Sequence, residues 1–101
     1  NEGSFQSAIR LAYFYADSYY TVVSELPSGK GFADIVFIPY VPDKPAIIVE
    51  LKRNTSVQSA IDQIRQKEYP DILKKYKDNL LLVGVSYSEK SKKHSAIIEK
   101  A

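Results

Sequence analysis

The chain has 101 residues, of which 45% are hydrophobic and 26% are charged, and these proportions are ordinary for one soluble globular domain. Its formal net charge of +2 is too small to identify a protein that binds polyanions through bulk charge alone. No stretch is apolar for long enough to span a bilayer. The absence of cysteine excludes a disulfide framework, a thiolate zinc cluster and a cysteine nucleophile.

The cellular setting and the domain boundaries are expectations at this point. A chain without cysteine fits a reducing compartment, and no secretory signal pattern opens the sequence, so we expect a cytoplasmic protein that is not attached to a membrane. The chain begins at Asn1, without a methionine, and enters helix-like sequence almost directly. We therefore expect residues 1–101 to be a single domain taken from a longer protein.

The N-terminal half predicts one helix followed by two strands. Apolar residues recur at helical spacing over residues 2–18, which indicates an amphipathic helix. Residues 21–26 alternate and are rich in β-branched side chains, and the turn residues of 27–31 separate them from a second apolar run at 32–38. These two runs are predicted to be strands.

The middle of the chain predicts a loop, a third strand and a second helix. The segment 39–45 contains three prolines, which lack N–H donors for a ladder, so it separates the second strand from a third at 46–52. Thr55 and Gln58 have capping-box spacing and predict the start of a helix. Its apolar face comprises Val57, Ala60, Ile61 and Ile64. Pro70 disfavours helical geometry at the residue before it, so the helix should break there, before a further turn or two.

The C-terminal third predicts a fourth strand at residues 80–87 and a fifth, at a sheet edge, at 94–99. This order of elements places the chain in the mixed α/β class. In the second and third strands apolar residues occupy both alternating sets, which is typical of central strands in a sheet covered on both faces.

Two acidic residues interrupt these central strands. If the strands pair antiparallel around a turn centred near Pro42, then Val36 pairs with Ile48 and Asp34 pairs with Glu50, with Cβ atoms roughly 5 Å apart on one face. A slip of one residue would send Asp34 into the opposite layer, so the in-phase register is favoured. Because side chains alternate along a strand, Lys52 shares the face of Glu50, while Leu51 points to the other side.

Two carboxylates at this distance repel each other, so either one becomes protonated or a cation joins them. Carboxylate and carbonyl oxygens suit Mg²⁺ or Mn²⁺, and Asp34, Glu50 and the backbone carbonyl of Leu51 could supply three such ligands. The metal would activate a bound water, while Lys52 could hold that water or stabilise the transition state. This combination predicts phosphodiester hydrolysis.

These residues resemble the bipartite active-site signature of the PD-(D/E)XK nuclease superfamily. The first part is Gly31-Phe-Ala-Asp34, with alanine where proline gives the superfamily its name, and the second is Ile47-Ile-Val-Glu50-Leu-Lys52. The resemblance covers nearly the whole chain. It implies a restriction-endonuclease-like α-β-β-β-α-β sandwich, an α/β fold in which helices flank a mixed central sheet.

Further residues resemble a bacterial subgroup of this superfamily that is often linked to an ATPase-like domain. They are Asn1-Glu2 and the stretch from Ala60 to Tyr69. The resemblance implies that Glu2 is the acid of the first helix and that Gln63 is the polar residue often carried by the following helix. Lys67 and Tyr69 extend the likeness. Within that subgroup an ATPase-like domain is the implied partner in the full-length protein.

Each candidate also has a plain structural interpretation. A Glu-x-Lys pattern occurs on exposed strands as a salt bridge across one face, although the apolar surroundings of Glu50 argue against that here. Glu2 could simply complement the helix dipole, and Gln63 could be an ordinary surface residue. Lys30, Arg53 and Lys67 are candidates for contacts with a nucleic-acid backbone.

The sequence thus predicts a Mg²⁺- or Mn²⁺-dependent nuclease, a hydrolase with DNA favoured over RNA as its substrate. The alternative is a catalytically silent module of the same fold that binds or regulates an ATPase-like partner domain. Sequence specificity, endonuclease or exonuclease action, and the choice between a monomer and a homodimer stay open.

Overall fold

The computed structural model describes residues 17–29, 31–76 and 78–101, with the side chain of Phe32 left out. The predicted first helix therefore lies outside the described residues up to position 16, and residues 17–19, its predicted end, form a turn. The candidates Glu2 and Lys30 also lie outside the described part of the chain. Within that part, no helix is long and apolar enough to cross a membrane.

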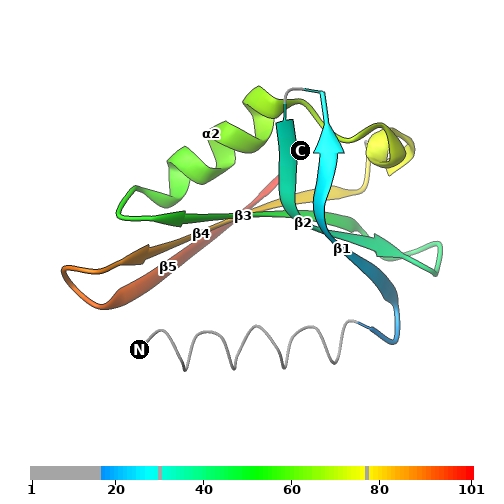
Figure 1. Cartoon of the computed structure of the whole chain (residues 1–101). Helices are drawn as coiled ribbons and strands as arrows, with labels where there is room; N and C mark the ends of the chain where they lie inside the picture. Colours follow the sequence, from blue (N-terminus) through cyan, green and yellow to red (C-terminus); the bar gives the residue numbers. More distant parts are fainter. Residues whose placement is uncertain (1–16, 30, 77) are drawn as a thin grey trace.

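Five strands form one mixed sheet, in the order β1-β2-β3-β4-β5 (Figure 1). Strands β3 and β4 pair in parallel, and the other three pairs are antiparallel. The strands are β1 (Tyr20–Ser28), β2 (Gly31–Pro39), β3 (Ala46–Arg53), β4 (Leu80–Ser88) and β5 (Lys93–Lys100). All five predicted strands are confirmed within two residues at each end, including the fifth at the sheet edge.

Helix α2 (Val57–Lys67) joins β3 to β4, because two parallel strands need a crossover connection. Ser56 caps it, and its hydroxyl accepts a hydrogen bond from the N–H of Ser59 at 3.2 Å. The predicted cap at Thr55 was therefore wrong by one residue. Both threonine and serine side chains can cap a helix. In the structure Ser56 is the cap, and the backbone carbonyl of Thr55 accepts a hydrogen bond from the Ser86 hydroxyl.

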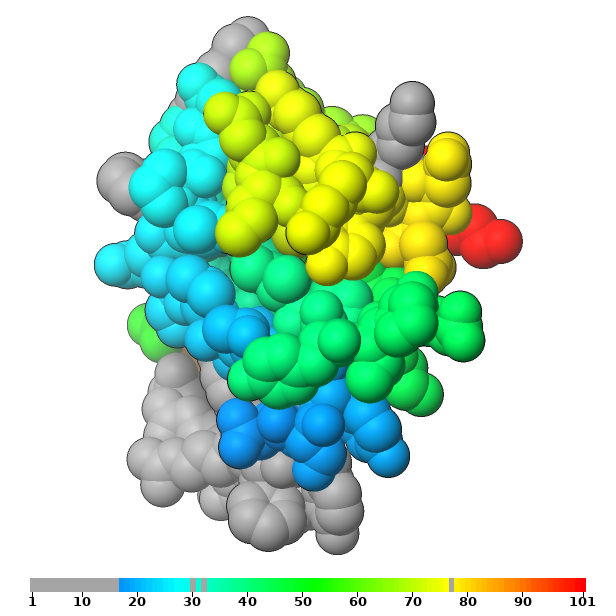
Figure 2. Space-filling model, turned by 90° about the vertical axis from the view of Figure 1, so that its right-hand side faces the viewer, coloured from blue at the N-terminus to red at the C-terminus, as the bar shows by residue number. Residues whose placement is uncertain are grey.

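The end of α2 confirms the predicted break before Pro70. The helix ends at Lys67, and Glu68 follows it with a positive φ of 63°. A short 3₁₀ helix, η1 (Asp71–Tyr76), continues the chain towards β4. Figure 2 looks onto this side, where η1 (yellow) lies beside the end of the β1–β2 hairpin (cyan). Leu73 of η1 and Leu26 of β1 belong to the same apolar cluster.

Buried apolar residues lie on both faces of the sheet. On the face covered by α2, Val36, Ile48 and Leu82 pack with residues of the helix and of η1. The opposite face carries Ile35, Val49 and Val85. These clusters confirm the interpretation that β2 and β3 are central strands buried on both sides. The predicted register is confirmed at Val36↔Ile48, whereas the predicted pair of Asp34 and Glu50 lies beyond the last pair of the ladder, Ile35↔Val49.

Helix α2 lies close to the sheet at Gly84 of β4. A Cβ at this position would stand 2.7 Å from the Val57 carbonyl oxygen and 3.1 Å from the Ala60 Cβ. Since the first contact is with backbone, Gly84→Ala should force α2 away from the sheet and lower the free energy of unfolding by about 1–3 kcal/mol. Urea denaturation measures this change, with Ser95→Ala on exposed β5 as the control. An unchanged midpoint for Gly84→Ala would contradict this close approach.

Candidate active site and metal centre

Asp34 lies where the β2–β3 ladder ends. The paired residues run from Phe37↔Ile47 to Ile35↔Val49, and in this register the next hydrogen-bonded rung would join Ala33 to Leu51. Instead, Oδ2 of Asp34 accepts the N–H of Leu51 at 2.9 Å. The carboxylate has taken the place of the Ala33 carbonyl as the acceptor of this N–H. It is therefore held beside the peptide that joins Glu50 to Leu51.

A bend in the β1–β2 hairpin explains this placement. Glu25 has a φ of 55°, and it lies opposite Asp34, between the rungs Ser24↔Ile35 and Leu26↔Ala33. Leu26 and Ala33 join the cluster on the α2 face, whereas Ile35 lies on the opposite face. Because Val36 also lies on the α2 face, strict alternation fails between Ala33 and Val36. Asp34 sits at the interruption, and its carboxylate points along the sheet towards β3.

Glu50 lies on the α2 face of β3 and is only 2% exposed. The ammonium of Lys67, near the C-terminal end of α2, donates to its Oε1 at 2.7 Å. Its other oxygen, Oε2, is buried and has no hydrogen-bond partner in the described part of the chain. Asp34 and Glu50 thus have different partners, the Leu51 N–H and the Lys67 ammonium, and the predicted meeting of their carboxylates on one face is not confirmed.

Lys52 and Leu51 lie on opposite sides of β3 by strand alternation. Lys52 shares the side of Glu50 and is half-buried, and no described side chain pairs with its ammonium. Leu51 is 39% exposed. The N–H and C=O of one strand residue point to the same edge, so the Leu51 carbonyl faces the Asp34 side, as the N–H does. The Leu51 carbonyl, which the sequence predicts to be a metal ligand, therefore faces the edge of β3 where Asp34 lies.

The remaining described candidates are Gln63 of α2 and Arg53 at the end of β3. Gln63 is half-buried and precedes Lys67 by one helical turn on the same face of α2, and both line an open hollow at the end of the helix. Arg53 is exposed and forms an ion pair with Glu89 at 2.9 Å, the kind of surface pair that contributes little to stability.

The contact between Lys67 and Glu50 was not foreseen from the sequence, which suggested a nucleic-acid contact for Lys67. One signal was present. Lys67 follows the buried Ile64 by three residues, so it lies near the inward face of α2.

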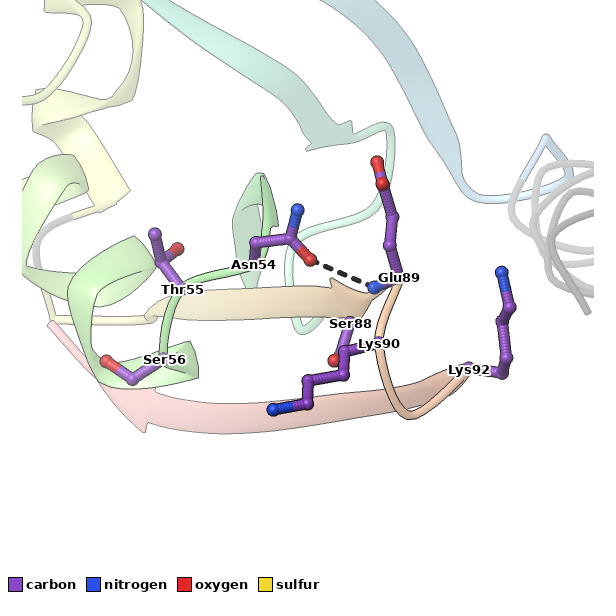
Figure 3. A pocket seen from close by; sticks show the side chains of 7 residues that line it. All are labelled: Asn54, Thr55, Ser56, Ser88, Glu89, Lys90 and Lys92. Carbon is purple, nitrogen blue, oxygen red and sulfur yellow. Dashed lines mark hydrogen bonds between the residues drawn. The ribbon is translucent and has the colours of Figure 1, made fainter.

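A second hollow lies at the C-terminal ends of β3 and β4, with a volume of about 840 Å³ (Figure 3). The side-chain oxygen of Asn54 accepts the N–H of Glu89 there at 2.9 Å, which fixes one loop against the other. Lys90 and Lys92 add positive charge to its rim. Asp34 and Glu50 do not line it, so this hollow neighbours the candidate site and is not part of it.

The donor atoms of Asp34, Glu50 and Leu51 suit a hard divalent cation by their chemical type. They are carboxylate and carbonyl oxygens, the ligands that Mg²⁺ and Mn²⁺ prefer, and the buried Oε2 of Glu50 is an acceptor whose bonding is incomplete. Among the residues that the structure describes, no group of three or more acids, histidines or cysteines gathers at one point. The fit therefore depends on two carboxylates and one peptide carbonyl, with water completing the coordination.

Comparison with known proteins agrees with this geometry. A family model described as the PD-(D/E)XK nuclease superfamily matches residues 1–97. Neither the curated proteins nor the solved structures gave a match. The five-stranded mixed sheet with its crossover helix is consistent with a restriction-endonuclease-like fold. PD-(D/E)XK nucleases generally use divalent metals, which suits the oxygen donors described above. The chain therefore belongs to the PD-(D/E)XK nuclease superfamily.

Proposed function

We propose that this domain is a Mg²⁺- or Mn²⁺-dependent nuclease that hydrolyses phosphodiester bonds of DNA, with RNA as the less favoured substrate. The observation that carries the proposal is the hydrogen bond from the Leu51 N–H to Asp34. This bond holds Asp34 against the main chain of β3 at Leu51, the residue between Glu50 and Lys52. Membership of a nuclease superfamily supports the same assignment.

Each residue of the site has a distinct role in this proposal. Asp34, Glu50 and the Leu51 carbonyl hold the cation, which when bound would lower the pKa of a water and offset charge on the phosphodiester. The N–H of Leu51 orients Asp34. Lys52 lies on the Glu50 side of β3, where its ammonium would orient the attacking water and stabilise the negative charge that develops on the phosphoryl oxygens.

Basic side chains near the C-terminal ends of β3 and β4 support a polyanionic substrate. Arg53 follows Lys52 directly, and Lys90 and Lys92 line the adjoining hollow (Figure 3). Contacts of this kind with phosphates fix the position of a nucleic acid without reading its sequence. We assign these lysines and Arg53 to backbone contacts on either side of the scissile phosphate.

A silent module attached to an ATPase-like partner domain is the second candidate. The observation that favours it is the pair between Glu50 and Lys67, because a buried acid that has its own internal counterion does not need a metal for charge balance. The low exposure of Glu50 is consistent with the same interpretation. Metal binding separates the two candidates.

The proposal is tested with the full chain, a panel of DNA and RNA substrates, and Mg²⁺ or Mn²⁺ with and without EDTA. We expect cleavage of DNA that EDTA abolishes and that Asp34→Asn also removes. Thermal denaturation should show a Tm that rises with Mn²⁺, since a ligand at 100 times its Kd stabilises the folded state by about 2.7 kcal/mol. A Tm that does not move at millimolar metal, together with no cleavage, would favour the silent module.

A further inference from the structure

The ion pair between Lys67 and Glu50 is largely buried. Side-chain exposures are 18% for Lys67 and 2% for Glu50, with 2.7 Å between Nζ and Oε1. Both residues line a narrow gap, together with Ser28 and Ala33, and this gap has no room for a water molecule. The hydroxyl of Ser28, like Oε2 of Glu50, is buried without a hydrogen-bond partner in the described part of the chain.

The narrow gap beside the Glu50 carboxylate has no space for a hydrated cation in this arrangement. Mg²⁺ gives up its water reluctantly and usually keeps several water ligands in a protein site. The gap around Glu50 does not admit even one water, whereas Asp34 and the Leu51 peptide lie at the β2 edge of β3. For Glu50 to share a cation with Asp34, its carboxylate must therefore turn towards that edge and leave the ammonium of Lys67.

We propose that Lys67 competes with the divalent cation for Glu50. Its ammonium neutralises the acid before the metal binds, and it weakens metal binding because the cation must displace it. This inference rests on the proposed metal-dependent function. An ammonium and a divalent cation repel each other strongly in a partly buried site, so both do not bind one carboxylate favourably. Exchange of one cation for the other means that the buried carboxylate is never left without a counterion. Lys67 is thus a positioning residue, acting through Glu50.

Calorimetric titration of the full chain with MnCl₂ tests the competition. Lys67→Gln removes the ammonium and should bind Mn²⁺ at least about tenfold more tightly than the unchanged protein, because a like charge has left the site. Lys67→Arg keeps the charge and should bind Mn²⁺ as weakly as the unchanged protein. The matched control is Lys74→Gln, which removes another ammonium with a carboxylate partner, Asp71 at 2.8 Å, but on an exposed surface. Its Mn²⁺ affinity should not change.

The outcomes separate this inference from the proposed function. If the unchanged protein binds Mn²⁺ and Lys67→Gln binds it equally or more weakly, the competition is disproved while the metal-dependent function stands. Tight binding by Lys67→Arg would also overturn it, since the charge would then not matter. If no variant binds Mn²⁺, the proposed function itself fails.

The test still works if Lys67→Gln is unfolded without metal. In that case circular dichroism would follow folding as MnCl₂ is added. Folding of Lys67→Gln at a Mn²⁺ concentration below the Kd of the unchanged protein would support the competition. Failure to fold at any Mn²⁺ concentration that saturates the unchanged protein would contradict it.

Discussion

Lys52→Ala is expected to lose cleavage by a factor of about 10²–10³ while it keeps its affinity for Mn²⁺. Loss of one preorganised donor to a developing negative charge typically has an effect of this size. Lys52 donates no ligand atom to the proposed metal centre, so its removal should not weaken metal binding. Single-turnover cleavage of a DNA substrate, measured beside calorimetric titration with MnCl₂, gives both quantities for one preparation.

Two further variants show whether the effect belongs to position 52. Lys100→Ala, which removes an exposed lysine from the end of β5, should cleave at the unchanged rate. Lys52→Arg keeps the positive charge but changes its shape and reach, so we expect partial activity between the two extremes. Full activity in Lys52→Ala would instead mean that Glu50-x-Lys52 is an ordinary strand pattern without a role in hydrolysis.

Breaking the buried ion pair between Glu50 and Lys67 should have the second largest effect, a decrease in the free energy of unfolding. Lys67→Met leaves a buried carboxylate without a counterion, and breaking a buried pair in this way destabilises a protein by about 3–5 kcal/mol. Adding Glu50→Gln to Lys67→Met removes the stranded charge, so the double variant should recover much of the loss. Chemical denaturation in EDTA measures all three free energies of unfolding, together with that of Glu50→Gln alone.

A surface pair of nearly equal length provides the control. Lys74 and Asp71 are 2.8 Å apart, with side chains 67% and 93% exposed. The hydrogen bond and the charge of Lys74 lower the pKa of Asp71, but water screens such a pair, and Lys74→Met should not change stability measurably. Burial, and not the distance between the charged atoms, should therefore decide the size of the effect. Strictly additive losses at Glu50 and Lys67 would contradict a coupled pair.

The strand pattern and register could be predicted from the sequence because local and global requirements agree there. Prolines in 39–45 separate the two strands, and only one phase of pairing keeps the two acidic interruptions, Asp34 and Glu50, out of opposite layers. The structure has that phase at Val36↔Ile48, and its ladder ends at Ile35↔Val49, one position before Asp34 and Glu50.

The detailed arrangement of the site depends on features without a local signal. Glutamate rarely takes a positive φ, so nothing in the sequence announces the bend at Glu25 that changes the direction of Asp34. The contact of Lys67 with Glu50 depends on how α2 crosses the sheet, which neighbouring residues do not determine. Capping was predicted one position early, since Thr55 and Ser56 are equally suitable in chemistry.

Asp34 occupies a position that a main-chain acceptor would otherwise fill, and this has a consequence for how such a domain can diversify. The bend at Glu25 directs the acid, and the backbone of β3 holds its carboxylate. The β1–β2 turn and the loop after β2 can therefore change in length or composition while the carboxylate keeps its distance from Leu51. The turn and the loop can thus vary to contact different substrates, while the position of the Asp34 carboxylate stays constant.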